Sequence, residues 1–146
     1  PGNAGRLFSL LANKGLSVDM IIQSYARSSN NTNDIAFTID KTVLSKFNEV
    51  VGELKEELKP SNFHIDEDIA KVSIVGAGMI DRPGIAAKMF ETLAQLGINI
   101  KMISTSEIKI SCLVEKSRAK EAVVALCNVF ELDGAAVADV KGDLPV

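Results

Sequence analysis

Apolar residues recur with the spacing of a helix at two distant places in the chain. They fall at positions 4, 7, 8, 11 and 12, and again at positions 86, 89, 90, 93 and 94. Steps of three and four residues place such side chains on one face of a helix. Each stretch follows a Pro-Gly pair and ends near Gly15 or Gly97, where a left-handed residue often terminates a helix. The pattern predicts two equivalent helices.

Segments rich in β-branched residues follow each of these helices and predict strands over 16–24 and 34–40, then over 98–105 and 107–115. An apolar segment, 70–75, predicts a strand ahead of the second Pro-Gly pair. A second helix is expected in each half, with Thr42 capping the first and Ser117 preceding the second. Short strands near 62–65 and 135–140 would complete the halves. The helical stripes are Val43, Leu44, Phe47, Val50, Val51, Leu54 and Leu58, and Ala119, Ala122, Val123, Leu126 and Phe130.

The two halves are copies of one unit. Residues 1–24 align with residues 83–106 without a gap, and ten of the 24 positions are identical. The order strand–helix–strand–strand–helix–strand predicts an α+β fold of the ferredoxin-like βαββαβ type, present twice in tandem. The expected domains are 1–66 and 67–146. The first copy begins at its Pro-Gly pair without a first strand, so we expect the natural chain to extend upstream.

Composition excludes several classes of protein. Of the 146 residues, 47% are hydrophobic and 24% charged, which is typical of a soluble globular protein. The net charge of -3, one Tyr and no Trp argue against nucleic acid as a partner. Apolar runs are far shorter than the roughly 20 residues of a membrane span. Two cysteines do not make a disulfide framework, so we expect the cytoplasm, or a plastid if a transit segment has been removed.

A glycine-rich segment after the predicted strand, residues 75–78, superficially matches a dinucleotide-binding loop. The match fails because Asp81 stands where glycine or alanine is required, and because the helix begins only near Gly84. We therefore expect no nucleotide cofactor.

Catalytic and metal chemistry find little support. His64 is the only histidine, so a metal site is not expected. Cys112 in a strand and Cys127 on a helix are interpreted as packed thiols, because no general base is evident to activate either one. We predict no catalytic residue in this chain.

The Pro-Gly pairs offer a binding site instead. Each opens directly into a helix, whose first N–H groups favour an anion such as a ligand carboxylate. Asp81 is placed to take an ammonium group, and the amides Gln23 and Asn99 to hold a polar ligand side chain. Simple helix-entry chemistry, and an ordinary hairpin at 104–107, remain the alternatives.

Several motifs in both halves of the chain resemble the C-terminal tandem ACT domains of aspartate kinases. The resemblance covers about residues 1–132, and its most specific element is the Ser-Thr-Ser-Glu-Ile segment. It implies the regulatory part of an enzyme that phosphorylates aspartate, with the catalytic domain elsewhere. The matching segments are 70–79, 82–84, 97–100 and 103–111, with 1–4, 17–23 and 34–38 in the first copy.

The resemblance also implies where an effector binds, because effectors of this family lie between ACT domains at an interface with a second chain. Carried over by position, one site comprises Pro1, Gly2, Asn3, Ala4 and Gln23, facing Asn99 and Ile100. A second comprises Asp81, Arg82, Pro83, Gly84, Ile85 and Ala86, facing Ser17 and Val18. Ser17 stands where the other copy has Asn99, which puts equal occupancy of the two sites in doubt.

Threonine is the implied effector, with lysine as a second candidate, and the implied partners are a homodimeric copy and an aspartate kinase catalytic domain or subunit. Two other interpretations stay open at this stage. One is that the ACT pair is a structural dimerisation module without a ligand. A small ferredoxin-like hydrolase would need a phosphate-cradling loop, and the surroundings of Arg82 do not supply one.

Overall fold

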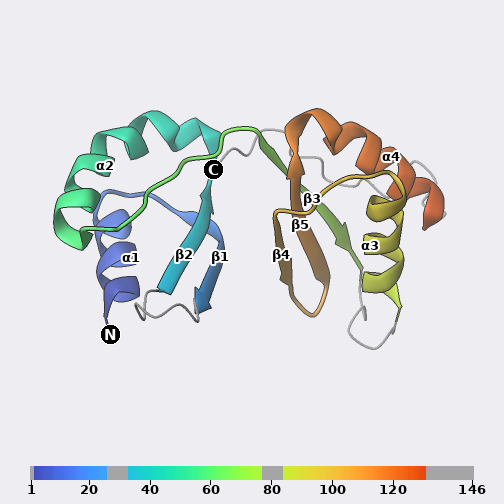
Figure 1. Cartoon of the computed structure of the whole chain (residues 1–146), viewed down its shortest axis with the longest axis horizontal. Helices are drawn as coiled ribbons and strands as arrows, with labels where there is room; N and C mark the ends of the chain where they lie inside the picture. The colour runs from blue at the N-terminus through green and yellow to red at the C-terminus, as the bar shows by residue number, and fades with distance from the viewer. Residues whose placement is uncertain (1, 26–32, 77–83, 131–146) are drawn as a thin grey trace. The chain divides into compact units, whose positions relative to one another are not determined.

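The computed structural model describes residues 2–25, 33–76 and 84–130 of the chain. These residues form two compact units, which divide between Glu67 and Asp68. In each unit, two helices pack on an antiparallel sheet (Figure 1). The predicted α+β fold with ferredoxin-like units is confirmed.

Unit 1 contains two helices and a two-stranded sheet. The two strands pair antiparallel, with a register shift between Val18 and Ile21. A 3-10 turn, η1, leads into the second helix. The elements are α1 (Asn3–Asn13), β1 (Val18–Tyr25), β2 (Asn33–Ile39), η1 (Lys41–Val43) and α2 (Leu44–Leu58).

Unit 2 repeats this arrangement with one more described strand. The strand order is β3-β5-β4, and both outer strands run antiparallel to β5. β3 and β4 are therefore parallel to one another on either side of β5, and α3 makes the crossover between them. The elements are β3 (Ile69–Val75), α3 (Ile85–Gln95), β4 (Met102–Thr105), β5 (Lys109–Glu115), η3 (Lys116–Arg118) and α4 (Ala119–Val129).

Each unit has its own hydrophobic core between its helices and its sheet. In unit 1 the rings of Phe8 and Phe47 both meet Phe37 edge-on, with centroids 5.8 and 6.0 Å apart. In unit 2 the β5 side chains Ile110, Cys112 and Val114 alternate toward the helices. The buried cores are Leu7, Leu11, Leu16, Ile39, Phe47, Val50 and Leu54, and Ala70, Val72, Met89, Leu93, Ile98, Ile110, Cys112, Val114, Ala119, Ala122 and Leu126.

The opposite face of the unit 2 sheet carries hydroxyl groups. Ser73 lies opposite Ser111, which in turn lies opposite Ser104. The Oγ atoms of Ser73 and Ser111 are 2.7 Å apart and share a hydrogen bond. Because Ser111 is buried, this bond supplies the partner that a buried hydroxyl requires.

The ends of the helices also follow from local chemistry. Gly15 and Gly97 adopt φ of +67° and +66°, the left-handed conformation predicted for them. In unit 2 the Arg118 guanidinium donates to the Leu96 carbonyl over 2.9 Å and pairs with Glu121 over 2.7 Å. Arg118 therefore supplies a donor to a carbonyl that has no partner within α3, and links the end of α3 to the start of α4.

Two predictions about the helices were wrong. Ala12 and Ala94 are exposed, because their methyl groups lie at the edge of the stripe that faces the core. Thr42 is not the cap of the second helix. The chain enters α2 through a 3-10 turn, and Asp40 caps that turn by accepting the Thr42 N–H over 2.8 Å.

Two strand predictions also differ from the structure. Residues 62–65 form no strand, because the left-handed Lys59 and then Pro60 turn the chain away from helix α2, and Phe63 stays exposed. The strand expected over 98–105 begins at Met102, since Ile98 is buried in the core and the first bond to β5 is made by the Lys101 N–H. The predicted strand at 135–140 lies outside the described residues.

We expect the substitution Leu93→Ala to lower the free energy of unfolding by about 2–5 kcal/mol, because Leu93 is fully buried and the change leaves a cavity. Ala94→Gln, at the exposed position next to it, should change stability by less than about 0.5 kcal/mol. Urea unfolding followed by far-UV circular dichroism measures both. Equal losses in the two variants would contradict the assignment of the α3 face.

Candidate functional site

The first helix of each unit begins at a glycine in the same unusual conformation. Gly2 has φ +95° and ψ -12°, and Gly84 has φ +96° and ψ -12°. A residue with a side chain rarely adopts such a left-handed backbone conformation, which explains why glycine stands at both positions. The two helix entrances are thus geometric copies of one another.

The amide groups in the first turn of both helices point out without a side-chain cap. Neither Gly2 nor Gly84 offers a capping oxygen, and neither first turn contains an acidic residue. The first internal bonds run from the Arg6 N–H to the Gly2 carbonyl (3.0 Å) and from the Lys88 N–H to the Gly84 carbonyl (2.8 Å). The N–H groups between them are oriented to donate to an anion, as predicted for a ligand carboxylate.

Gln23 lies at the same end of unit 1 as this helix entrance. α1 and β1 run in opposite directions, so the start of α1 and the end of β1 lie at the same end of the unit (Figure 1). Gln23 is paired with Ile35, which packs into the core, so its side chain is on the helix-covered face of the sheet. The Gln23 side chain is exposed there, together with Gly2 and Asn3, while Ala4 is half-buried.

Thr105 occupies the corresponding place in unit 2, and the sequence analysis did not include it in either site. It pairs with Ile110, a core residue, so it also lies on the helix-covered face, at the last position of β4. β4 ends at the same end of unit 2 at which α3 begins (Figure 1). The gap-free repeat already aligns Gln23 with Thr105. That alignment, extended from the glycines to the strand ends, could have found it.

The remaining predicted residues lie at the other end of their own units. Ser17 and Val18 precede or begin β1, and Asn99 and Ile100 stand in the connection between α3 and β4. Ser17 and Asn99 are exposed, whereas Val18 and Ile100 are half-buried and pack against the cores. The pairing of these residues with a helix entrance of another unit or chain stays a prediction.

The second predicted site is described only in part. Ile85 and Ala86 direct their side chains toward the core of unit 2, so that their contribution to a ligand would come from backbone N–H groups. Pro1, Asp81, Arg82 and Pro83 lie outside the described residues.

The structure describes two other candidate groups, Gly76 of the glycine-rich segment and His64. The Gly76 N–H donates to the Ile108 carbonyl over 2.8 Å and is therefore not free for a phosphate. His64 is exposed in an irregular segment. Among the described residues no cluster of histidine, cysteine and acidic side chains could hold a metal ion. No helix in this part of the chain has the length and apolar character to cross a membrane.

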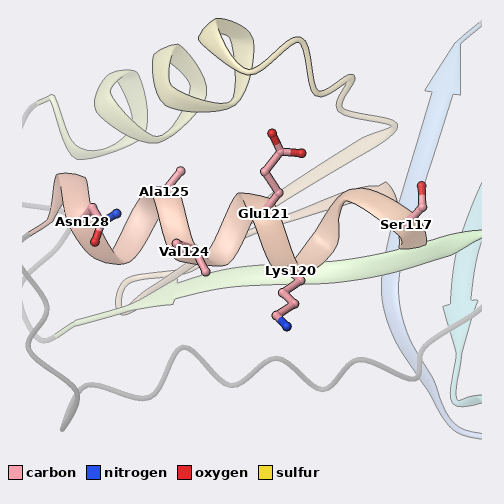
Figure 2. Close-up of a pocket in the computed structure, with 6 residues that line it drawn as sticks. All are labelled: Ser117, Lys120, Glu121, Val124, Ala125 and Asn128. Atoms are coloured by element: carbon pink, nitrogen blue, oxygen red, sulfur yellow. The ribbon is translucent and has the colours of Figure 1, made fainter.

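A shallow hollow on the outer face of α4 coincides with none of the predicted site residues. Figure 2 shows its lining side chains along the continuous stretch of η3 and α4, with Val124 exposed among polar neighbours. The hollow lacks a convergent set of polar groups from more than one element, which a specific small-molecule site normally has. Its lining residues are Ser117, Lys120, Glu121, Val124, Ala125 and Asn128.

Comparison with known proteins places this geometry in a family. A model of the ACT domain matches residues 72–130. The chain is 47% identical over 131 residues to the aspartokinase of Bacillus sp. (strain MGA3), covering 90% of this chain and 31% of that protein. The crystal structure of the ligand-free regulatory subunit of aspartate kinase from Thermus thermophilus superposes with a TM-score of 0.81 at 38% identity, covering 89% of this chain and 85% of that one.

The chain belongs to the regulatory part of the aspartate kinase family. It spans about a third of the length of the curated aspartokinases that it matches. A further structural relative is E. coli aspartokinase III in complex with lysine and aspartate in its T-state, with a TM-score of 0.65 at 27% identity. That match covers 88% of this chain and 28% of the E. coli protein.

Replacing Gly84 with alanine should destabilise unit 2 by roughly 1–2 kcal/mol through backbone strain alone, since an added Cβ would meet no atom within 4 Å. Gly52→Ala in the interior of α2 also meets open space but has an ordinary helical backbone, so it should stabilise by about 0.5–1 kcal/mol. Urea unfolding distinguishes them by sign. A stabilising Gly84→Ala would refute the left-handed helix entrance.

Cys112 should resist alkylation in the folded protein. Burial raises the pKa of this thiol from 9.0 to about 12, so at pH 8 almost none of the reactive thiolate forms. In a Cys127→Ser variant at pH 8, iodoacetamide should label Cys112 only after urea is added, as mass spectrometry would show. Fast labelling without urea would mean that β5 is not buried as described.

Proposed function

We propose that this regulatory region binds free threonine, with lysine as a second candidate, and thereby mediates feedback inhibition of an aspartate kinase. The main support is the uncapped helix entrance at Gly2, with Gln23 near the end of β1 at the same end of unit 1. Bare N–H groups suit the carboxylate common to all amino acids. The Gln23 amide can both donate to and accept from a ligand hydroxyl, which favours threonine.

The lysine held by E. coli aspartokinase III in its T-state supports an amino-acid effector in this family. Lysine would place an ammonium group where threonine has a hydroxyl. The carbonyl oxygen of the Gln23 amide accepts from either one, so this site alone does not favour threonine strongly over lysine.

The proposed inhibition requires a second partner. The effector would join a helix entrance to residues such as Asn99 and Ile100 of another ACT domain, in a homodimer, and the bound dimer would hold a catalytic domain or subunit in an inactive arrangement. A coupling free energy of about 1–3 kcal/mol would change affinity roughly 5- to 150-fold. The two free cysteines, Cys112 and Cys127, are compatible with a cytoplasmic location.

Titration of the chain with threonine, lysine and methionine by calorimetry tests the proposal. We expect threonine to release or absorb heat saturably, and Gln23→Ala to weaken its binding about 2- to 10-fold through loss of one hydrogen bond. Ser24→Ala is the matched control, because Ser24 is the next residue on β1 and faces the other side of the sheet.

The outcomes separate sensing from a purely structural ACT module. Sensing predicts that Gln23→Ala loses affinity while the dimer, measured by analytical ultracentrifugation, stays intact. A folded dimer that binds none of the three amino acids would favour the structural module. Equal effects of Gln23→Ala and Ser24→Ala would remove Gln23 from the site.

A further inference from the structure

Two ion pairs connect α1 to α2 in unit 1, one near each end of α1. Arg6 in the first turn of α1 pairs with Glu57, and Lys14 just beyond the end of α1 pairs with Glu53. All four side chains are between 39% and 54% exposed. Exposed pairs of this kind add about 0–1 kcal/mol each to stability, so neither is required for the fold.

The Arg6 contact differs from the other pair because it includes the backbone. The Arg6 Nη2 atom donates to the Glu57 carbonyl over 3.1 Å, and Nε lies 3.4 Å from the Glu57 Oε1 atom. Glu57 is the last residue but one of α2, where helix carbonyls lack partners and carry partial negative charge. Arg6 therefore offsets negative charge that would otherwise lie beside the start of α1.

Distance along α1 decides which cation can affect a ligand at Gly2. At a rise of about 1.5 Å per residue, the backbone of Arg6 lies about 6 Å from that of Gly2 along the axis, and the backbone of Lys14 about 18 Å. The screening length at physiological ionic strength is about 8 Å. A carboxylate at the helix entrance would thus sense Arg6 and be largely screened from Lys14.

Unit 2 has a cation at the equivalent place. Lys88 aligns with Arg6 in the repeat, and its ammonium lies 5.1 Å from the ring centre of Phe130, directly after α4. In both units, a basic side chain from the first turn of the first helix therefore reaches the end of the second helix. The contact itself differs, with a carbonyl and carboxylate in unit 1 and an aromatic ring in unit 2.

We propose that Arg6, held by Glu57, is a positioning residue that sets the affinity of the unit 1 helix entrance for the carboxylate of an amino-acid effector. The inference rests on the proposed function, and it adds a residue that neither makes the hydrogen bonds of the site nor stabilises the fold appreciably. Arg6 supplies positive charge near the bare N–H groups, and Glu57 both fixes and attenuates that charge.

The two partners should therefore act in opposite directions. Arg6→Gln removes the cation and should weaken threonine binding about two- to five-fold in low salt. Glu57→Gln keeps the carbonyl that holds Arg6 but removes the opposing charge, so binding should stay equal or strengthen up to about two-fold. A pair that only supports structure would instead weaken binding in both variants.

Calorimetric titration with threonine, or with lysine if only lysine binds, in about 20 and 500 mM NaCl tests this. The gap between the unaltered chain and Arg6→Gln should close at high salt, and Arg6→Lys, which keeps the charge, should recover most of the affinity. Lys14→Gln is the control, with a similar effect on urea unfolding and none on binding.

Three results would overturn the inference. These are unchanged affinity in Arg6→Gln, equal weakening in Glu57→Gln, and an Arg6→Lys variant as weak as Arg6→Gln. If Arg6→Gln does not fold, Glu57→Gln and the salt dependence of the unaltered chain still test the inference. Weaker binding in Glu57→Gln, or binding in the unaltered chain that does not weaken at high salt, would overturn it. Absence of binding in the unaltered chain is a separate outcome, because it refutes the proposed function together with the role of Arg6.

Discussion

The candidate site depends on one constraint, a glycine with a left-handed backbone at the start of a helix. At Gly2 and Gly84 the chain enters its helix without a serine, threonine or aspartate whose oxygen would occupy the first-turn N–H groups. An ordinary cap would fill that place from within the protein. Its absence leaves the first-turn N–H groups without a side-chain cap, and the proposed carboxylate site relies on those groups.

Duplication has preserved this backbone and changed the side chains around it. Gln23 corresponds to Thr105, and Arg6 corresponds to Lys88. Asn3, exposed at the first helical position of unit 1, corresponds to Ile85, which packs into the core of unit 2. Because such positions lie at the rim of each core, they can diverge without loss of the fold. The two helix entrances therefore share one backbone conformation but differ in the polarity and length of the side chains around them.

The helices and strands were predictable from the sequence because their apolar spacing coincides with the cores that form. The repeat also predicts that each of the two helices begins at the glycine of a Pro-Gly pair. The sequence did not predict which of two nearby side chains caps the entry to α2. Asp40 rather than Thr42 is the cap, because an aspartate two residues before a free N–H reaches it directly. The face on which Thr105 lies depends on its pairing with Ile110, which spacing alone does not specify.

The hydroxyl pair of Ser73 and Ser111 has a further consequence for the alignment of β5. A slip of one residue along β3 would push Ser111 into the apolar layer and turn Cys112 and Val114 outward. A buried hydroxyl stranded among aliphatic groups is penalised by about 1–3 kcal/mol, so the bond disfavours that misalignment. Since β4 takes its alignment from the same strand, two serines on the far surface help fix the position of Thr105 at the end of β4.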